Sequence, residues 1–363
     1  MATIEQTVLR YKRFYQSGEP GDILVVTEFP APPWSDREFP KAHVLHAIDF
    51  RTENVALARA QVRYMRWWMQ NRRIEDDWVP GLNIDYGHGV RIALLSGSDV
   101  VFSNFTSWSK PVLKTWDDFG KLKFDEDSFW LQKIVESNEV WKGMDLEGDI
   151  FVMPFFHCSP MDYAWGLRGE DIFTDIYEHP GELRMLLDFC VKGILWFEKI
   201  ISRHAVSGSM GRAIWGTWVP EGTIFVNGDP ADLVSADLYR EFGLEYDNRA
   251  FTGTGGGFFH HHSIGLHQVR NIAGINNLHV QNITIDPNTK SLTEMLQTDK
   301  QSRDNLIKAS LVKPIHFLNI KPEEVVRNMD VLKEGRFILR VDCADKEAAE
   351  SIVRKVRQAS NFQ

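Results

Sequence analysis

Three consecutive histidines, His260-His261-His262, stand far from either end of the chain and follow the run Gly255-Gly256-Gly257-Phe258-Phe259. In an extended strand successive side chains point to opposite faces, so His260 and His262 share one face and His261 takes the other. Two imidazoles on one face, near the end of a strand, supply half of a transition-metal site. The sequence therefore predicts a metal centre if the fold brings a third ligand to this face.

Composition excludes several classes of partner and location. The 363 residues carry a net charge of −9, and no run rich in Lys or Arg is present, which argues against nucleic acid or an anionic membrane surface as partner. No apolar stretch approaches the ~20 residues that span a bilayer. The first residues lack the apolar core of a signal peptide. Three cysteines do not make a disulfide framework, and we therefore expect a protein of the reducing cytoplasm.

The aromatic content is unusual, with 12 Trp and 23 Phe among 363 residues. Most of these side chains must lie in the core. The number also suits a pocket for a flat or apolar ligand.

Short β-rich runs alternate with longer helical patterns along the chain, and this alternation is typical of a parallel sheet. Eight such runs predict a closed (β/α)₈ TIM barrel in a single domain over residues 1–363. A long insertion at about 85–148 elaborates the N-terminal third, with an added hairpin at 99–108. The strands are expected at 22–29, 78–84, 149–156, 213–219, 256–262, 277–281, 314–320 and 336–341.

Barrel enzymes carry their chemistry at the carboxyl ends of the strands, so the residues expected there are candidates for function. Three strand ends bear histidine and one bears cysteine. Polar residues near the ends of the first two strands are candidate substrate contacts. The candidates at the rim are His157, Trp215, Trp218, His260, His262, His279, Gln281 and Cys343, with Glu28, Asn83 and Tyr86 at the first two strands.

Four segments resemble the uroporphyrinogen decarboxylase superfamily in order and spacing. They are SPMDYAWGLRGEDIFTDIYEHPGELRMLL (159–187), GDPADLVSADLYREFGLEYDNRA (228–250), FFHHHSIGLHQVRNIAGINNLHVQN (258–282) and KPIHFLNIKPEEVVRNMDVLKEGRFILRVDCAD (313–345). The resemblance covers residues 150–350 well and residues 1–150 loosely. It implies a (β/α)₈ barrel, in agreement with the strand count.

Two chemistries occur in that superfamily, and the residues separate them. True uroporphyrinogen decarboxylases bind a tetrapyrrole with many carboxylates, which requires a cluster of arginines. Here the first strand is followed by Pro30-Ala31-Pro32-Pro33-Trp34 and the net charge is −9, so that substrate fits poorly. The other branch comprises zinc-dependent methyltransferases that work with corrinoid proteins, and this chain is more similar to it.

The resemblance to the methyltransferase branch implies a zinc site. The family motif is His-x-Cys after strand five and Cys after strand eight, and it falls on His260, His262 and Cys343. His262 stands where the family has its first Cys, so the implied ligand set is His₂Cys. Such a zinc ion would polarise an ether or alcohol oxygen better than a thiolate-rich one.

We therefore expect an enzyme that moves a methyl group from a methoxylated, aromatic small molecule to a corrinoid on a separate protein. His157 or His279 would donate a proton or orient a ligand, and Asp229 would contact substrate or cap a helix. Tyr163, Trp165, Trp215 and Trp218 would line the pocket, although the two last residues also fit barrel packing. The alternative is a metal-assisted lyase, hydrolase or decarboxylase that needs no corrinoid.

Overall fold

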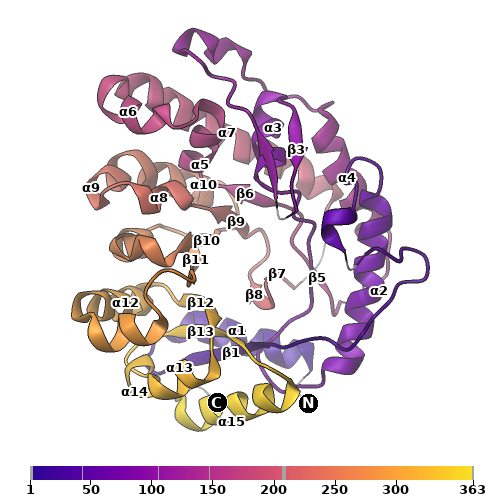
Figure 1. The fold of residues 1–363 in the computed structure, drawn as a ribbon, viewed down its shortest axis with the longest axis vertical. Helices are drawn as coiled ribbons and strands as arrows, with labels where there is room; N and C mark the ends of the chain where they lie inside the picture. The colour runs from indigo at the N-terminus through magenta and orange to yellow at the C-terminus, as the bar shows by residue number, and fades with distance from the viewer. Residues whose placement is uncertain (1–2, 43, 105, 147, 207–209, 362–363) are drawn as a thin grey trace.

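A computed structural model describes residues 3–42, 44–104, 106–146, 148–206 and 210–361. Seven parallel strands form one sheet in the order β1-β13-β12-β11-β10-β9-β6. In Figure 1 they follow one another from β6 in the upper part to β1 in the lower part, with helices outside them. The strands are β1 Ile23–Glu28, β2 Gly81–Leu82, β3 Val100–Phe102, β4 Ser107–Ser109, β5 Phe151–Val152, β6 Phe156–Cys158, β7 Arg212–Ile214, β8 Thr217–Val219, β9 Ile224–Asn227, β10 Gly257–His262, β11 Leu278–Thr284, β12 Ile315–Ile320 and β13 Phe337–Asp342.

Helices follow most strands and cover the outer face of the sheet, as an α/β fold requires. The α-helices are α1 Ile4–Ser17, α2 Asn54–Arg72, α3 His88–Ser96, α4 Phe129–Lys142, α5 Pro160–Arg168, α6 Asp171–Glu178, α7 Pro180–His204, α8 Asp229–Leu233, α9 Ala236–Tyr239, α10 Glu245–Thr252, α11 Val269–Ala273, α12 Lys300–Val312, α13 Pro322–Arg327, α14 Met329–Leu332 and α15 Lys346–Ala359. Short 3₁₀ or π turns are η1 Leu45–Ala47, η2 Trp116–Lys121, η3 Arg240–Leu244, η4 Ser263–Gln268 and η5 Glu294–Thr298. None of the described helices is both long and apolar enough to cross a membrane.

The gap between the edge strands β1 and β6 is occupied by the short parallel pair β2–β5. The Asp77 N–H donates to Val25 O (2.8 Å), and the Asp77 carboxylate accepts from Val25 N (2.8 Å), so the segment before β2 lies against β1. In the part of the chain that is described, the seven-stranded ladder itself does not continue through this pair. The parallel α/β sheet expected from the sequence is confirmed, and full closure into an eight-stranded barrel stays a prediction.

The strand expected at 213–219 is instead an antiparallel hairpin, β7–β8. The strand that belongs to the sheet is β9, Ile224–Asn227, which was not predicted. The run expected at 149–156 divides into β5 and β6, and β11 ends at Thr284 rather than Gln281. The hairpin expected at 99–108 is confirmed as β3–β4, with residue 105 outside the described residues.

The β7–β8 hairpin packs against the sheet interior because of its turn. Trp215 and Gly216 both have positive φ, 49° and 79°. A Cβ on Gly216 would lie 2.5 Å from the Trp78 ring, so only glycine fits there. The Trp215 ring packs at 5.1 Å from Phe225 and 5.9 Å from Phe258, residues of β9 and β10. The hairpin turn thereby lies against β9 and β10.

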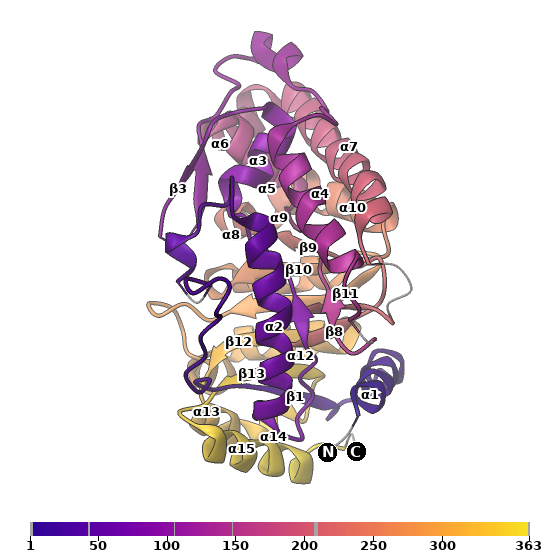
Figure 2. The ribbon, with the colours of Figure 1, turned by 90° about the vertical axis from the view of Figure 1, so that its right-hand side faces the viewer.

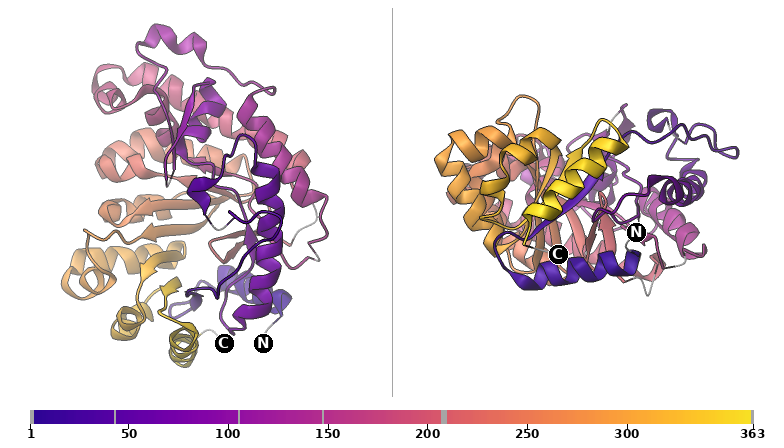
Figure 3. Two further views of the ribbon diagram at one scale, coloured as in Figure 1. Left: turned by 45° about the vertical axis from the view of Figure 1, so that its right-hand side comes forward. Right: turned by 90° about the horizontal axis from the view of Figure 1, so that it is seen from below.

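Figures 2 and 3 show α2 running lengthwise along one side of the molecule and both termini at its lower end. Near the C-terminus, Asn361 N–H donates to Gly21 O (3.1 Å), just before β1. The chain just before β1 and the chain just after α15 are thus held together, and α15 packs beside β1.

Candidate metal centre

A cavity of about 830 Å³ opens at the carboxyl ends of β6, β9 and β10. Its wall is rich in aromatic rings and also carries several ionisable groups. The aromatic lining is Trp108, Phe156, Trp165, Trp215 and Phe225, and the polar lining includes Asp85, His88, Arg91, Asn227, Asp229, His260 and His262. A flat, mostly apolar ligand with one polar atom suits such a space.

Asp229, His260 and His262 form a possible ligand set, since one ligand atom from each lies within 4.8 Å of the others. His260 and His262 project from the same face of β10, with ring centroids 5.0 Å apart. Asp229 begins α8 directly after β9, where the Gly228 N–H donates to His260 O (2.9 Å). The pairing of β9 with β10 therefore places the carboxylate beside the imidazoles.

Both imidazoles are oriented by acceptors at Nδ1. The His260 Nδ1–H donates to Asn282 Oδ1 (2.5 Å), and the Asn282 amide is oriented by its own donation to His316 O (3.0 Å). The His262 Nδ1–H donates to the two carboxylate oxygens of Asp286 (2.9 and 3.1 Å). In both rings Nε2 is left as the nitrogen that can bind a metal, an arrangement usual for metal-binding histidines.

The electrostatics of this set suit a cation. Burial lowers the pKa of His260 to about 3, so this imidazole is neutral and keeps its lone pair. Burial and the charge of Asp162 raise the pKa of Asp229 to about 7. Asp229 Oδ1 is buried without a hydrogen-bond partner and lies 3.6 Å from His262 Nε2. A buried carboxylate oxygen in this state is costly unless a cation offsets its charge, so the residues fit a bound metal.

A second set of possible ligands, His88, Cys158 and Asp162, also lies within 4.8 Å among its own ligand atoms. His88 Nε2 is 3.0 Å from Asp162 Oδ1. Neither set includes Cys343.

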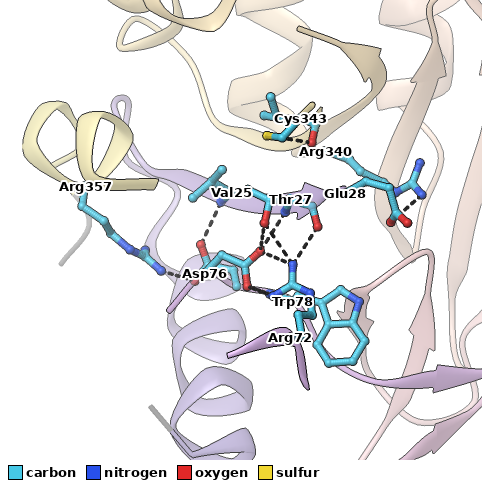
Figure 4. Close-up of polar contacts among 11 residues, drawn as sticks. Val25, Thr27, Glu28, Arg72, Asp76, Trp78, Arg340, Cys343 and Arg357 are labelled. Atoms are coloured by element: carbon cyan, nitrogen blue, oxygen red, sulfur yellow. Dashed lines mark hydrogen bonds and ion pairs between the residues drawn. The ribbon is translucent and has the colours of Figure 1, made fainter. Parts of the chain in front are cut away.

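The structure does not bring the expected third ligand, Cys343, together with His260 and His262. Figure 4 shows its sulfur turned toward Val341 O, at 3.6 Å, near β1. Its side chain packs in the apolar cluster between β13 and α15, and burial and the charge of Asp342 raise the pKa of the thiol to about 11. Strand β13 is the third neighbour of β10, an offset along the sheet of roughly 14 Å at the usual strand spacing.

His157 and Tyr163 do not line the cavity, contrary to expectation. On β6 the alternation of side chains turns Phe156 into the cavity and His157 outward. His157 Nε2 contacts Glu198 Oε1 (2.9 Å) on α7, and its Nδ1 contacts the Tyr163 hydroxyl (3.2 Å). All three belong to a buried polar network behind the sheet.

The strand-end positions expected for His279 and Gln281 are also wrong. Because β11 runs from Leu278 to Thr284, His279 stands at its amino end, with Nε2 bonded to Gly255 O (2.9 Å). Gln281 is buried in mid-strand and its amide contacts His261 Nε2 (2.9 Å). The neighbouring Asn282 is the residue of this strand that contacts His260 of the candidate metal centre.

Of the expected aromatic residues, Trp165 and Trp215 line the cavity. Trp218 faces the other way, toward α1, where its Nε1–H donates to Met210 O (3.0 Å) and its ring lies 6.1 Å from Tyr15. Trp218 is a packing residue.

The expected substrate contacts of the first strands are placed apart from the metal centre. Glu28 is exposed and pairs with Arg340 (2.9 Å; Figure 4). Asn83 and Tyr86 line a smaller cavity of about 430 Å³ that shares Asp85 and Thr106 with the larger one.

Several residues of the site are not predicted from the sequence. Asp162 and Asn282 lie inside segments that carry the family resemblance, but no role was assigned to them. His88 and Arg91 begin a helix in the long insertion, where no strand end marks them. The missed residues are Asp85, His88, Arg91, Trp108, Asp162, Asn282 and Asp286.

No family model matches the chain, and no curated protein matches it by sequence. Among solved structures, a methyltransferase from Methanosarcina mazei is similar in fold, with a TM-score of 0.60, 12% sequence identity and coverage of 99% of each chain. This similarity extends over the whole chain and concerns the fold.

Proposed function

We propose that the chain is a zinc-dependent methyltransferase that takes a methyl group from a methoxylated aromatic compound and passes it to a corrinoid on a partner protein. The observation that carries the proposal is the meeting of Asp229, His260 and His262 at the wall of an aromatic cavity. The similarity of fold to a methyltransferase supports it. Asp229 takes the ligand role that the sequence had assigned to Cys343.

The proposed ligand set favours chemistry at oxygen. Two neutral imidazoles and one carboxylate leave a divalent zinc ion with a net charge of +1, and no thiolate reduces its Lewis acidity. When bound, the zinc ion would stabilise negative charge on the oxygen from which the methyl group departs. The corrinoid of the partner protein would supply a reduced cobalt as acceptor of the methyl group, and the electron pair of the methyl–oxygen bond would remain with the oxygen.

The residues of the chain itself orient the two imidazoles and bind the substrate. Asn282 and Asp286 hold the two imidazoles in one tautomer. Trp165 and Trp215 supply ring surfaces on which a flat substrate can lie, and they exclude water from the reacting oxygen. Arg91 is paired with Asp85 (2.8 Å) and contributes no free charge to the cavity wall.

A lyase, hydrolase or decarboxylase without corrinoid is the second candidate. Two histidines and a carboxylate also form the ligand set of hydrolytic zinc sites. The Asp229 carboxylate beside the two imidazoles is the observation that favours this candidate.

One assay separates the two candidates. The zinc-loaded protein is incubated with methoxybenzoates, with and without cob(I)alamin, while methylcobalamin and the free phenol are measured. We expect both products, and only when the corrinoid is present. Free phenol formed equally without corrinoid would support the second candidate, and no reaction with any methoxylated aromatic would reject the proposal.

A matched pair of histidine variants tests the site itself. His260→Ala should lower the rate at least 100-fold, because it removes a metal ligand. His279→Ala should leave the rate within about twofold, because this histidine lies at the opposite end of the sheet.

A further inference from the structure

The second set of possible ligands comes from three elements that meet beside the first centre. His88 begins α3, Cys158 ends β6, and Asp162 lies in the first turn of α5. Figure 1 shows these elements together in the upper part of the molecule. Ser159 fixes the start of α5 by accepting from the Asp162 N–H (3.2 Å). The local fold therefore holds imidazole, thiol and carboxylate in one place.

Asp162 is a buried acid with one oxygen that has no hydrogen-bond partner. It is fully buried, and its Oδ1 lies 3.0 Å from His88 Nε2. Its Oδ2 is buried with no hydrogen-bond partner. A buried acid oxygen without a hydrogen-bond partner destabilises the folded state, and it does so more strongly when the acid is charged. A ligand at Oδ2 would remove this cost.

Each of the two ligand sets contains a buried acid with one oxygen left without a partner. These oxygens are Asp162 Oδ2 and Asp229 Oδ1. The Arg91 guanidinium at the cavity wall is already paired with Asp85. A single cation at Asp229, His260 and His262 would leave Asp162 with its contact to His88 and an unpartnered Oδ2.

We propose that His88, Cys158 and Asp162 bind a second divalent cation beside the one at Asp229, His260 and His262. An imidazole, a thiol sulfur and a carboxylate are the ligands that zinc takes in proteins. On binding, the Cys158 thiol proton and any proton on His88 leave to solvent, and the thiolate and carboxylate together carry −2 against the +2 of the ion. This inference does not depend on methyl transfer.

Only one of the two sites contains a sulfur ligand, so a spectroscopic signal from sulfur can distinguish them. The Asp229–His260–His262 set has none, whereas the second set contains Cys158. In protein loaded with Co²⁺, a thiolate-to-cobalt charge-transfer band in the near ultraviolet therefore reports only the second site. We expect wild-type protein to bind two cations per chain and to show this band.

Single-residue variants test whether the charge-transfer band comes from Cys158. Cys158→Ser should abolish the band and leave one cation per chain. Cys343→Ser is the matched control and should retain both cations and the band, since that sulfur lies in the core near β13. His260→Ala should retain the band while losing the other cation. Asp162→Asn, which keeps the shape of the side chain, should weaken the second site at least tenfold and serves if Cys158→Ser misfolds.

A wild-type chain that saturates with one cation and shows no band would overturn the inference. So would a band that survives Cys158→Ser or disappears in Cys343→Ser. These readouts are metal counts and spectra, so they fail or succeed separately from the methyl-transfer assay.

Discussion

Asp286 determines the orientation of His262, because its carboxylate accepts from Nδ1 at 2.9 and 3.1 Å. Removing it frees the ring to rotate and lowers the basicity of Nε2. We predict that Asp286→Ala weakens zinc binding about 10- to 100-fold, the usual cost of losing such a partner. Equilibrium competition with a zinc chelator measures this change.

The control for Asp286 is Asp330→Ala, which removes an exposed carboxylate on α14 and should leave zinc affinity unchanged. Equal weakening in the two variants would contradict a local role for Asp286. Retained affinity in Asp286→Ala would show that His262 is held by other contacts.

For single residues, the sequence could predict only those properties that depend on local backbone geometry, such as the face of a strand on which a side chain lies. The common face of His260 and His262 follows from strand alternation alone, and the structure brings the pair to the cavity. The third ligand depends on which loop stands beside β10, and this is set by the pairing of β9 with β10. Because β9 was not predicted, Asp229 was given a capping or substrate role and Cys343 was chosen from the family motif.

Among the elements, the β7–β8 hairpin presents its two tryptophans to opposite sides. Trp215 lines the cavity and lies 5.2 Å from the His260 ring, whereas Trp218 packs on α1. We predict that Trp215→Ala weakens binding of a methoxylated aromatic 10- to 100-fold, about 1.4–2.7 kcal/mol, through lost ring contact. Calorimetric titration or KM measures it.

Trp218→Ala is the matched control for Trp215. It should lower thermal stability and leave substrate affinity within about twofold. If both variants weaken substrate binding equally, the hairpin acts through general packing and Trp215 is not a substrate contact.

Helix α10 carries a buried acid that should make stability depend on pH. Burial raises the pKa of Asp247 to about 7, while the Tyr239 hydroxyl donates to its Oδ2 (2.7 Å). The unfolded chain has a value near 3.9 for this group. Between about pH 4 and pH 7 the Asp247 carboxyl is protonated in the folded chain and ionised in the unfolded chain. The stability that this protonated carboxyl contributes is therefore complete below about pH 4 and is lost as the pH rises through about 7.

Asp247→Asn should remove this dependence. Relative to the variant, we predict that the wild-type free energy of unfolding falls by about 2–4 kcal/mol between pH 4 and pH 8. Denaturant unfolding at the two pH values measures it. Asp237→Asn, at an exposed position on α9, should titrate like the wild type, and parallel pH profiles for wild type and Asp247→Asn would refute the assignment.

The elements show why the fold class could be predicted better than its details. Seven of the eight runs expected from the sequence overlap parallel strands, which is enough to indicate an α/β sheet. The hairpin and β9 lie within one stretch of sixteen residues, 212–227, and both consist mostly of apolar residues. Which of them joins the sheet is decided by pairing with β6 and β10, contacts that are distant in sequence.

For the whole molecule, metal binding should couple the centre to global stability. The proposed ligands join α8, which follows β9, to β10 in the middle of the sheet, and the unfolded chain has no such site. A ligand present at 1,000 times its Kd stabilises the folded state by about 4 kcal/mol. For a chain of 363 residues this corresponds to a shift in Tm of about 5 °C.

We therefore predict that removing zinc with a chelator lowers the Tm by at least this amount, and that re-adding zinc restores it. Scanning calorimetry with metal content measured on the same samples tests this. The double variant His260→Ala with His262→Ala should lose less Tm on chelator treatment than the wild type, because it lacks the two imidazole ligands and keeps only the second set, His88, Cys158 and Asp162. A wild-type Tm that does not change when zinc is shown to have left would mean that these residues hold no metal coupled to folding, since binding to the folded chain alone must stabilise it.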